Sequence, residues 1–358
     1  MVSMKKLNIG VIGLGGIANF HIAGILASGD AVLWSICDCN EEALKKRAEE
    51  FDIPEARQYL NYEELLQDPE LDAVMIGTPN GSHFAIANEA IKNGKPFALE
   101  KPLTIDVREA AILKELLEAG RIPHMICFSY RYKTAARYAK WLIGQGKLGT
   151  VHHVYSQYLQ GWAINEQLPL LWRFRKELSG SGALGDLGSH IFDLERFLVG
   201  DISRVIADAG TIVKERRQLT GSGNGEVDVD DYCHVLARLE GGISSSMTIT
   251  RFAYGRGNYQ RVEIYGTKGA LVYSLDEEDT LYVKFEEEND EVFRKVDIPD
   301  EFKADQMQSF FNLLNGRGDG LDATIEDGYV NQLTIDAVIE SFTEERWMEV
   351  KKEVSQIV

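Results

Sequence analysis

The stretch from Gly180 to His190 holds the residues with the clearest potential for chemistry. It reads Gly-Ser-Gly-Ala-Leu-Gly-Asp-Leu-Gly-Ser-His and leads into a helix expected at residues 184–198. Asp186 and His190 are four residues apart, so they share one face of that helix. A carboxylate beside an imidazole can orient a group that transfers protons. The glycines leave little side-chain bulk, so we expect a ligand to approach the backbone closely here.

The same pattern also fits a helix whose histidine is buried and hydrogen-bonded for structural reasons. The stretch alone therefore does not decide between a catalytic pair and a structural one. The elements that must position it, and the motifs upstream of it, decide the question.

A glycine turn near the N-terminus supplies the first of these motifs. An apolar strand expected at residues 7–12 runs into Gly13-Leu14-Gly15-Gly16-Ile17-Ala18, and a helix follows to about residue 28. Strand, glycine turn and helix in this order are the fingerprint of a dinucleotide site, with phosphate at the helix N-terminus. Asp38 follows the second expected strand, where an acidic residue can accept a hydrogen bond from a ribose 2′-hydroxyl.

Strands and helices alternate up to residue 128. Further strands are expected at residues 73–77, 96–99 and 124–128, with helices at 41–51, 62–66, 83–93 and 106–119 between them. This alternation predicts a doubly wound parallel sheet, in which ligands bind beyond the carboxyl ends of the strands. Asp38, Thr78, Asn80 and Lys101 all follow strands at that edge.

The second half has a different pattern. After an expected helix at residues 133–144 and a strand at 151–158, alternating apolar runs at 232–239, 243–252 and 260–265 indicate antiparallel strands. Two helices, at 304–314 and 325–346, close the chain. We therefore expect an α/β protein with two domains: residues 1–128 form a Rossmann domain, and residues 129–358 form an α+β domain with a large, mostly antiparallel open sheet.

Composition excludes several classes of partner. The 358 residues carry a formal charge of −18, from 38 basic and 56 acidic residues, which disfavours nucleic acid and anionic membranes. No run of about 18 apolar residues indicates a membrane span, and residues 1–6 carry no signal-peptide pattern. The four cysteines, Cys37, Cys39, Cys127 and Cys233, form no paired clusters, and His152 and His153 point to opposite faces of a strand. We expect a cytoplasmic protein with reduced cysteines and no metal.

Three motifs together resemble the glucose-fructose oxidoreductase/inositol dehydrogenase (Gfo/Idh/MocA) family. They are the glycine turn at residues 13–18, the tripeptide Glu100-Lys101-Pro102, and Gly182 with Asp186 and His190. The resemblance covers essentially the whole chain, and the last two motifs together are highly specific. It implies that NAD or NADP is the cofactor and that Lys101, Asp186 and His190 are the catalytic set. Trp172-Arg173-Phe174, with Gln157 and Trp162 upstream, resembles the branch that acts on sugars, inositols or anhydrosugars.

The chemistry of the residues agrees with that implication. Oxidation of a secondary alcohol needs a hydride acceptor, a base for the hydroxyl proton and a positive charge near the developing alkoxide. His190 is the expected base, Lys101 the expected cation, and Asp186 the group that orients substrate or His190. Trp162 and Trp172 fit either core packing or an apolar wall of the site.

The expected cofactor-binding residues are Gly13, Gly15, Gly16, Ile17, Asp38, Thr78, Asn80, His83, Glu100, Lys101, Arg131, Trp172 and Arg173. The expected substrate-binding residues are Lys101, Arg131, Gln157, Trp162, Asp186 and His190. No arginine adjoins Asp38, so NAD is expected rather than NADP. We also expect a cis Lys101-Pro102 bond, a polyol or sugar substrate, and a homodimer or homotetramer built through the second sheet.

Two other functions remain open at this point. A hydrolase or epimerase on the same fold would use NAD transiently, without accumulating NADH. A non-catalytic ligand sensor usually lacks part of the lysine, aspartate and histidine set, which is intact here.

Overall fold

The computed structural model describes residues 5–276, 278–288 and 290–351, and it divides into two compact units. The first unit comprises Met1–Phe128 and Asp305–Tyr329, and the second comprises Ser129–Ala304 and Val330–Val358. One boundary falls where the change of sequence pattern places it, after residue 128. The segment Asp305–Tyr329 differs from expectation, because it belongs to the first unit and not to the second.

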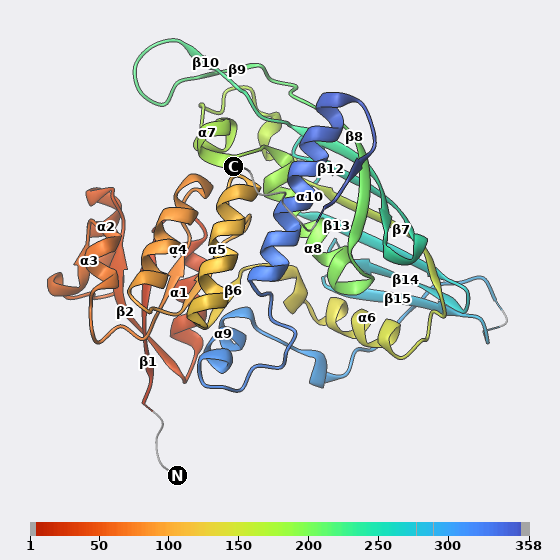
Figure 1. Cartoon of the computed structure of the whole chain (residues 1–358), viewed down its shortest axis with the longest axis horizontal. Coiled ribbons are helices and arrows are strands. Elements are labelled where there is room, and N and C mark those ends of the chain that lie inside the picture. The colour runs from red at the N-terminus through yellow and green to blue at the C-terminus, as the bar shows by residue number, and fades with distance from the viewer. Residues whose placement is uncertain (1–4, 277, 289, 352–358) are drawn as a thin grey trace. The chain divides into compact units, whose positions relative to one another are not determined.

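The first unit is built on a six-stranded parallel sheet with the strand order β3-β2-β1-β4-β5-β6 (Figure 1). Its strands are β1 (Leu7–Ile12), β2 (Ala31–Cys37), β3 (Gln58–Tyr59), β4 (Ala73–Ile76), β5 (Phe97–Leu99) and β6 (His124–Ile126). Its helices are α1 (Ala18–Ala27), α2 (Glu41–Glu50), α3 (Tyr62–Leu66), α4 (His83–Lys92), α5 (Val107–Gly120) and α9 (Gln306–Leu314). The expected doubly wound sheet is confirmed, and only the two-residue edge strand β3 was missed.

Side-chain caps explain where several of these helices begin. The Asn40 side chain accepts a hydrogen bond from the Ala43 N–H ahead of α2, and Asp106 accepts from the amides of Arg108 and Glu109 ahead of α5. The helix α1 has no such side-chain cap. It instead follows the glycine turn directly.

Long-range contacts explain why α9 belongs to the first unit. A Cβ atom on Gly24 of α1 would lie 2.3 Å from Met307 Cγ, so the glycine lets α9 pack directly on α1. The Ile126 N–H donates to the Ala323 carbonyl oxygen at 2.9 Å, which ties the same segment to the edge of the sheet. These contacts join residues about 200 to 280 positions apart, so no local pattern predicts them.

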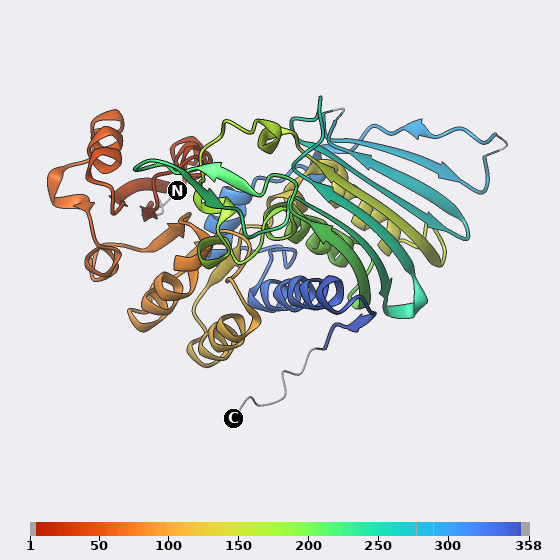
Figure 2. The ribbon, with the colours of Figure 1, turned by 90° about the horizontal axis from the view of Figure 1, so that it is seen from above.

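The second unit is built on a nine-stranded sheet with the order β16-β15-β14-β13-β7-β12-β11-β8-β17, which forms one curved layer in Figure 2. Its strands are β7 (Val151–Leu159), β8 (Ile202–Gly210), β11 (Tyr232–Leu239), β12 (Ser244–Thr250), β13 (Tyr259–Gly266), β14 (Gly269–Ser274), β15 (Thr280–Phe285), β16 (Arg294–Lys295) and β17 (Met348–Glu349). A separate hairpin pairs β9 (Glu215–Arg217) with β10 (Asn224–Glu226). All pairs in the large sheet are antiparallel except β7 with β12.

Helices cover one face of this sheet. They are α6 (Thr134–Gly144), α8 (Ser189–Leu198) and the part of α10 (Ile325–Glu344) that belongs to this unit, which also contains the short α7 (Lys176–Ser179). Residues of α8 and α10, such as Ile191 and Val338, form one buried cluster with Val235 and Met247 of the sheet. The other face is open, and Tyr155 and Leu236 on it are 48% and 54% exposed.

The helix expected at residues 184–198 is present, with one local difference. Residues Leu184–Gly188 form a π-helical turn, and α8 continues from it. Single π turns inside helices occur frequently at functional sites. No helix in the described part of the chain is long and apolar enough to cross a membrane.

Candidate active site

The glycine turn of the first unit has the geometry that a phosphate cradle needs. Gly13 has φ +90°, and a Cβ atom there would lie 2.7 Å from the Gly77 carbonyl oxygen. Only glycine fits that position. At Gly15 and Gly16 a Cβ atom would meet nothing within 4 Å, so their backbone faces open space. Ile17, which follows, is 40% exposed at the start of α1.

Asp38 is held beside this turn by two backbone amides. The Leu14 N–H donates to Asp38 Oδ2 and the Asn40 N–H donates to Oδ1, both at 2.8 Å. The carboxylate therefore stays at the carboxyl end of β2, next to the glycine turn. An open glycine backbone beside a fixed carboxylate suits the phosphates and the ribose of a dinucleotide.

The tripeptide Glu100-Lys101-Pro102 follows β5 in the same unit. The Lys101-Pro102 peptide bond is cis, as expected. Glu100 Oε1 lies 3.0 Å from Nε2 of the fully buried His21 of α1, and Glu100 Oε2 accepts from the Lys101 N–H at 3.3 Å. His21 thus fixes the carboxylate next to Lys101, a contact that the sequence pattern did not reveal.

One group of potential metal ligands occurs here. His21, Glu100 and Cys127 offer ligand atoms within 4.8 Å of one another. The His21–Glu100 contact is already a hydrogen bond, and burial raises the pKa of the Cys127 thiol well above its usual value. A thiol that resists ionisation is a poor metal ligand, so the expectation of no metal stays a prediction.

His83 has a different place from the one expected. Its side chain is 0% exposed, with Nδ1 2.9 Å from the Pro102 carbonyl oxygen and Nε2 3.0 Å from that of Thr78. Burial lowers the pKa of His83, and a neutral ring donates to only one of these oxygens at a time. His83 therefore joins the ends of two strands and is not placed to contact a cofactor. Thr78 accepts a hydrogen bond from Ser82, and Asn80 is 7% exposed.

In the second unit, the π turn and α8 carry Asp186 and His190 on one face. His190 is 7% exposed, and its ring packs edge-on against Tyr130 at 4.7 Å between ring centroids. Tyr158 of β7 lies next to it, with its centroid 6.0 Å from that of His190. The two phenol rings also contact each other, with centroids 5.6 Å apart, so the imidazole packs against a pair of tyrosines, which the sequence pattern did not predict.

The two tyrosines form a hydrogen-bonded group with an amide. Their hydroxyl oxygens lie 2.6 Å apart, the Tyr158 hydroxyl donates to Asn258 Oδ1 at 2.7 Å, and Asn258 Nδ2 donates to the Tyr130 hydroxyl at 3.1 Å. Burial, Tyr130 and the negative charge of Asp186 all raise the pKa of Tyr158. The Tyr158 phenol therefore keeps its proton and acts as a hydrogen-bond donor beside His190.

Arg173 lies next to Asp186, as the expected site requires. Arg173 Nε is 3.8 Å from Asp186 Oδ2, and the two side chains are 44% and 26% exposed. Trp172 is adjacent, because the Arg173 guanidinium lies over its ring at 4.4 Å. Asp186, His190, Arg173 and Trp172 therefore all belong to the second unit, whereas Lys101 belongs to the first.

Arg131 does not have the placement expected of a binding residue. It is 4% exposed and lies in the 3-10 helix Ser129–Tyr132. Its guanidinium forms an ion pair with Asp193 of α8, to which Nε donates at 2.8 Å and Nη2 at 2.6 Å. This buried ion pair anchors α8 three residues beyond His190. The sequence shows an arginine near the site but not which carboxylate it meets.

Gln157 and Trp162 also differ from expectation. Gln157 points to the open face of the sheet, where it borders a hollow with Tyr155 and Arg261, while the adjacent Tyr158 faces His190. Successive side chains of a strand alternate in direction, so Gln157 and His190 lie on opposite sides of the sheet. Trp162 packs on the buried Phe174 with ring centroids 5.6 Å apart, which supports the core-packing interpretation.

Two glycines that flank Asp186 serve packing and not ligand approach. A Cβ atom on Gly182 would lie 1.8 Å from the Asp230 carbonyl oxygen, and one on Gly188 would lie 3.1 Å from Ile249 Cδ1. The expectation that these glycines admit a ligand is wrong for both positions. They let the turn approach the sheet instead.

Family models match both halves of the chain. The model described as an oxidoreductase family with an NAD-binding Rossmann fold matches residues 7–123, and the GFO/IDH/MocA C-terminal domain model matches residues 136–272.

Named relatives cover nearly all of the chain. Levoglucosan dehydrogenase of Pseudarthrobacter phenanthrenivorans is 31% identical over 97% of this chain and 99% of its own length. Myo-inositol 2-dehydrogenase of Thermotoga maritima is 27% identical over 79% of this chain and 80% of its own length. A solved structure of levoglucosan dehydrogenase in complex with NADH has a TM-score of 0.90 and 32% identity, and covers 98% of this chain and 100% of that chain.

The two family models, the relative that is 31% identical over nearly the whole chain, and the solved structure with the same fold all indicate one family. The glycine turn and Asp38 supply the observations that fit NAD to the first unit. The chain therefore belongs to the Gfo/Idh/MocA family of oxidoreductases, and its first unit contains the family's NAD-binding Rossmann fold.

Proposed function

We propose that this chain is an NAD-dependent dehydrogenase that oxidises a secondary hydroxyl of a sugar, an inositol or an anhydrosugar. The observation that carries the proposal is the surroundings of His190, a nearly buried imidazole packed against the adjacent rings of Tyr130 and Tyr158, with Asp186 on the same helical face. The relatives named for levoglucosan and myo-inositol support this class of substrate.

Each group has a role in this chemistry. His190 takes the proton from the substrate hydroxyl, and Asp186 orients the substrate or the imidazole. Lys101 donates to the same oxygen and stabilises the negative charge that develops on it. NAD, when bound, supplies the hydride acceptor. The protonated Tyr158 phenol remains a donor throughout, because its pKa is raised.

The polar groups of the second unit favour a substrate with many hydroxyls. Arg173, Asp186 and the Tyr158 hydroxyl offer donors and acceptors beside aromatic faces. A site built to pair hydroxyls discriminates against analogues that lack them, because its polar groups are then left without partners. We therefore expect activity on cyclic polyols or pyranoses and little on isopropanol.

A panel of polyols, sugars and anhydrosugars assayed with NAD tests the proposal. We expect NADH absorbance to rise with at least one ring compound and kcat/KM on isopropanol to be at least about 100-fold lower, as for other sites that pair hydroxyls. Product formation without NADH, from protein that retains bound cofactor, would instead identify a hydrolase or epimerase. Comparable activity on isopropanol would overturn the proposed substrate class.

A further inference from the structure

We propose that Asp230 and Asp231, two adjacent buried carboxylates ahead of β11, are positioning residues for the Arg173–Asp186 pair. The inference rests on the proposed function, because it concerns the side chains that are assigned to that site. Each carboxylate anchors the backbone that carries one member of the pair, Asp230 that of Asp186 and Asp231 that of Arg173.

Asp230 anchors the π turn that carries Asp186. Its Oδ1 accepts from the Gly182 N–H and its Oδ2 from the Leu184 N–H, both at 2.7 Å, while its carbonyl oxygen accepts from the Ala183 N–H at 3.0 Å. Three consecutive amides therefore donate to one residue. The Asp186 N–H in turn donates to the Gly182 carbonyl oxygen at 3.0 Å, so the anchored segment bonds directly to the site residue.

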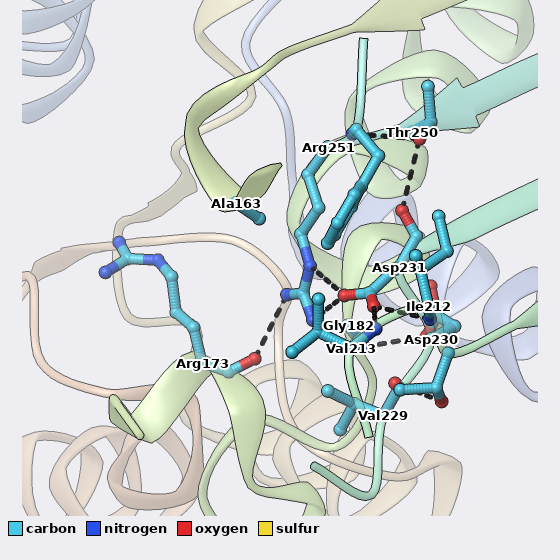
Figure 3. Close-up of polar contacts among 12 residues, drawn as sticks. Ala163, Arg173, Gly182, Ile212, Val213, Val229, Asp230, Asp231, Thr250 and Arg251 are labelled. Carbon is cyan, nitrogen blue, oxygen red and sulfur yellow. Dashed lines mark hydrogen bonds and ion pairs between the residues drawn. The ribbon is translucent and has the colours of Figure 1, made fainter. Parts of the chain in front are cut away.

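Asp231 anchors the loop that carries Arg173, through Arg251. Asp231 is 0% and Arg251 1% exposed, and Arg251 Nε donates to Asp231 Oδ1 at 2.8 Å. Arg251 Nη1 then donates to the Arg173 carbonyl oxygen at 3.2 Å. Figure 3 shows this chain of contacts, with the Arg173 side chain extending away from the carbonyl that Arg251 holds.

The second oxygen of Asp231 fixes the carboxylate itself. Asp231 Oδ2 accepts from the Ile212 N–H at 2.7 Å and the Val213 N–H at 3.2 Å, as Figure 3 also shows. A carboxylate held on both oxygens gives the buried guanidinium a fixed partner.

Aromatic packing gives Arg251 a specific orientation. Its guanidinium carbon lies 4.7 Å from the Phe174 ring centroid and 5.5 Å from that of Trp162. Phe174 follows Arg173 directly, so the ring contact and the hydrogen bond hold the same short segment. A lysine could neither stack as a plane nor donate in two fixed directions, so the two residues are not interchangeable here.

The Arg173–Asp186 pair cannot hold this geometry alone. Its atoms are 3.8 Å apart and its side chains 44% and 26% exposed, and exposed ion pairs of this kind contribute little. The buried contacts of Asp230 and Asp231 instead fix the backbone from which the two side chains extend. Because the two carboxylates are consecutive, the turn and the loop are held by one short piece of backbone.

The test compares Arg251→Lys and Asp230→Asn with the control Asp228→Asn. Asp228 is exposed and two residues before Asp230, and its carboxylate accepts from the Lys176 N–H at 2.6 Å. It thus has the same chemistry on the same segment, but its carboxylate contacts neither Arg251 nor the turn at residues 182–186. Its N–H donates to the Phe174 carbonyl oxygen at 3.4 Å, a backbone contact that the substitution leaves in place. Far-UV circular dichroism and the Tm establish that each variant is folded.

Amide hydrogen exchange of the protein without ligands gives the first readout. We expect at least tenfold faster exchange of residues 172–175 in Arg251→Lys, and of residues 182–186 in Asp230→Asn, with both regions unchanged within twofold in Asp228→Asn. Unchanged exchange in the first two variants would overturn the proposal, whatever their kinetic constants are.

Kinetics on the substrate found in the panel give the second readout. Arg251→Lys should raise KM at least fivefold with kcat changed less than threefold, and Asp230→Asn should lower kcat at least tenfold. Faster exchange with unchanged kinetics would also overturn the proposal. A wild-type chain without any NADH formation would instead refute the proposed function, while the exchange data still decide whether the anchors act.

Discussion

The hydroxyl oxygens of Tyr130 and Tyr158 lie 2.6 Å apart, and both phenol rings pack against the imidazole of His190. The Asn258 side chain bonds to both hydroxyls, and Gln160 Nε2 donates to the Tyr158 hydroxyl and to Asn258 Oδ1, so the four side chains form one network. A fixed, protonated Tyr158 therefore gives the imidazole a defined polar neighbour.

Tyr158→Phe tests whether this group serves the chemistry. Loss of the hydroxyl should lower stability by about 1 kcal/mol, the usual net contribution of a hydrogen bond, because Tyr130 keeps its contact with Asn258. We expect kcat/KM to fall by about tenfold or more, which corresponds to about 1.4 kcal/mol. Urea unfolding and steady-state kinetics measure the two effects.

Tyr155→Phe is the matched control, because Tyr155 lies on the same strand but on the open face of the sheet. Its kinetic constants should equal those of the wild type. An equal loss of activity in both variants would show that the effect of Tyr158→Phe is not specific to the site.

Gln157 and Tyr158 show what the sequence pattern alone could not predict, namely which face of β7 lies toward the site. The strand was predicted, but its polar residues gave no sign of which face meets the helices, and one position along a strand reverses the direction of the side chain. By contrast, the glycine turn and Asp38 depend on a few neighbouring residues, so local chemistry predicted them, while the cis Lys101-Pro102 bond was expected from the family resemblance.

Partners far apart in sequence explain the other differences. Arg131 and its partner Asp193 are 62 positions apart in the sequence, and Gly182 and Asp230 are 48 positions apart. The residues next to them in the sequence give no sign of either partner. Arg131 was therefore assigned to binding when the structure buries it, and Asp230 was not assigned at all. Pairing of this kind depends on the topology of the sheet, which only the structure supplies.

Cofactor selection provides a second prediction. The Asp38 carboxylate, held by the amides of Leu14 and Asn40, would accept from a ribose 2′-hydroxyl and repel a 2′-phosphate. We expect kcat/KM for NAD to exceed that for NADP by at least about tenfold, or about 1.4 kcal/mol. Asp38→Asn should reduce that ratio, whereas Glu49→Gln, an exposed position at the far end of α2, should not. Equal efficiency of the wild type with both cofactors would refute the assignment.

The buried carboxyl group of Glu195 in α8 should make the free energy of unfolding depend on pH. Burial raises its pKa to about 7, although the hydroxyls of Ser156 and Ser245 both donate to Oε1, at 2.5 Å and 2.9 Å. A carboxyl whose pKa is higher in the folded state binds more protons there, so its contribution to stability falls as pH rises from the unfolded value to about 7. Between pH 5.5 and pH 8 the loss should be about 2 kcal/mol.

Glu195→Gln removes this titration, so the comparison isolates it from other groups. The free energy of unfolding of the wild type minus that of the variant should be about 2 kcal/mol more favourable at pH 5.5 than at pH 8. Urea titrations at both values measure it. A difference that does not change with pH would mean that Glu195 keeps its ordinary pKa.

The open face of the second sheet predicts self-association. The strand registers place Leu236, Ser246 and Tyr155 in one row across β11, β12 and β7, and both larger side chains are about half exposed. A leucine and a tyrosine exposed on the uncovered face of a sheet suit contact with a second copy of the chain. We expect a homodimer or homotetramer at micromolar concentration by light scattering.

Leu236→Glu should shift that mass toward the monomer, because it introduces a charge into the contact. Leu219→Glu is the control, since Leu219 is 64% exposed but lies outside the large sheet. A monomeric wild type, or an equal effect of both variants, would rule out this face as the interface.

The final prediction separates the roles of His190 and Lys101. If His190 accepts the hydroxyl proton, oxidation should rise with pH as the imidazole becomes neutral, so kcat/KM should show an ascending limb. His190→Ala should remove that limb and lower kcat by roughly 10²–10⁴-fold, the range for a lost acid–base group. Lys101→Ala should lower kcat at least as much, because it removes charge stabilisation formed mainly in the transition state.

Binding of NAD, followed by fluorescence quenching, should survive both changes, since the glycine turn and Asp38 are untouched. His152→Ala, an exposed histidine of β7, is the control and should keep the wild-type profile. A folded His190→Ala protein that binds NAD and retains both kcat and the ascending limb would show that another group accepts the proton.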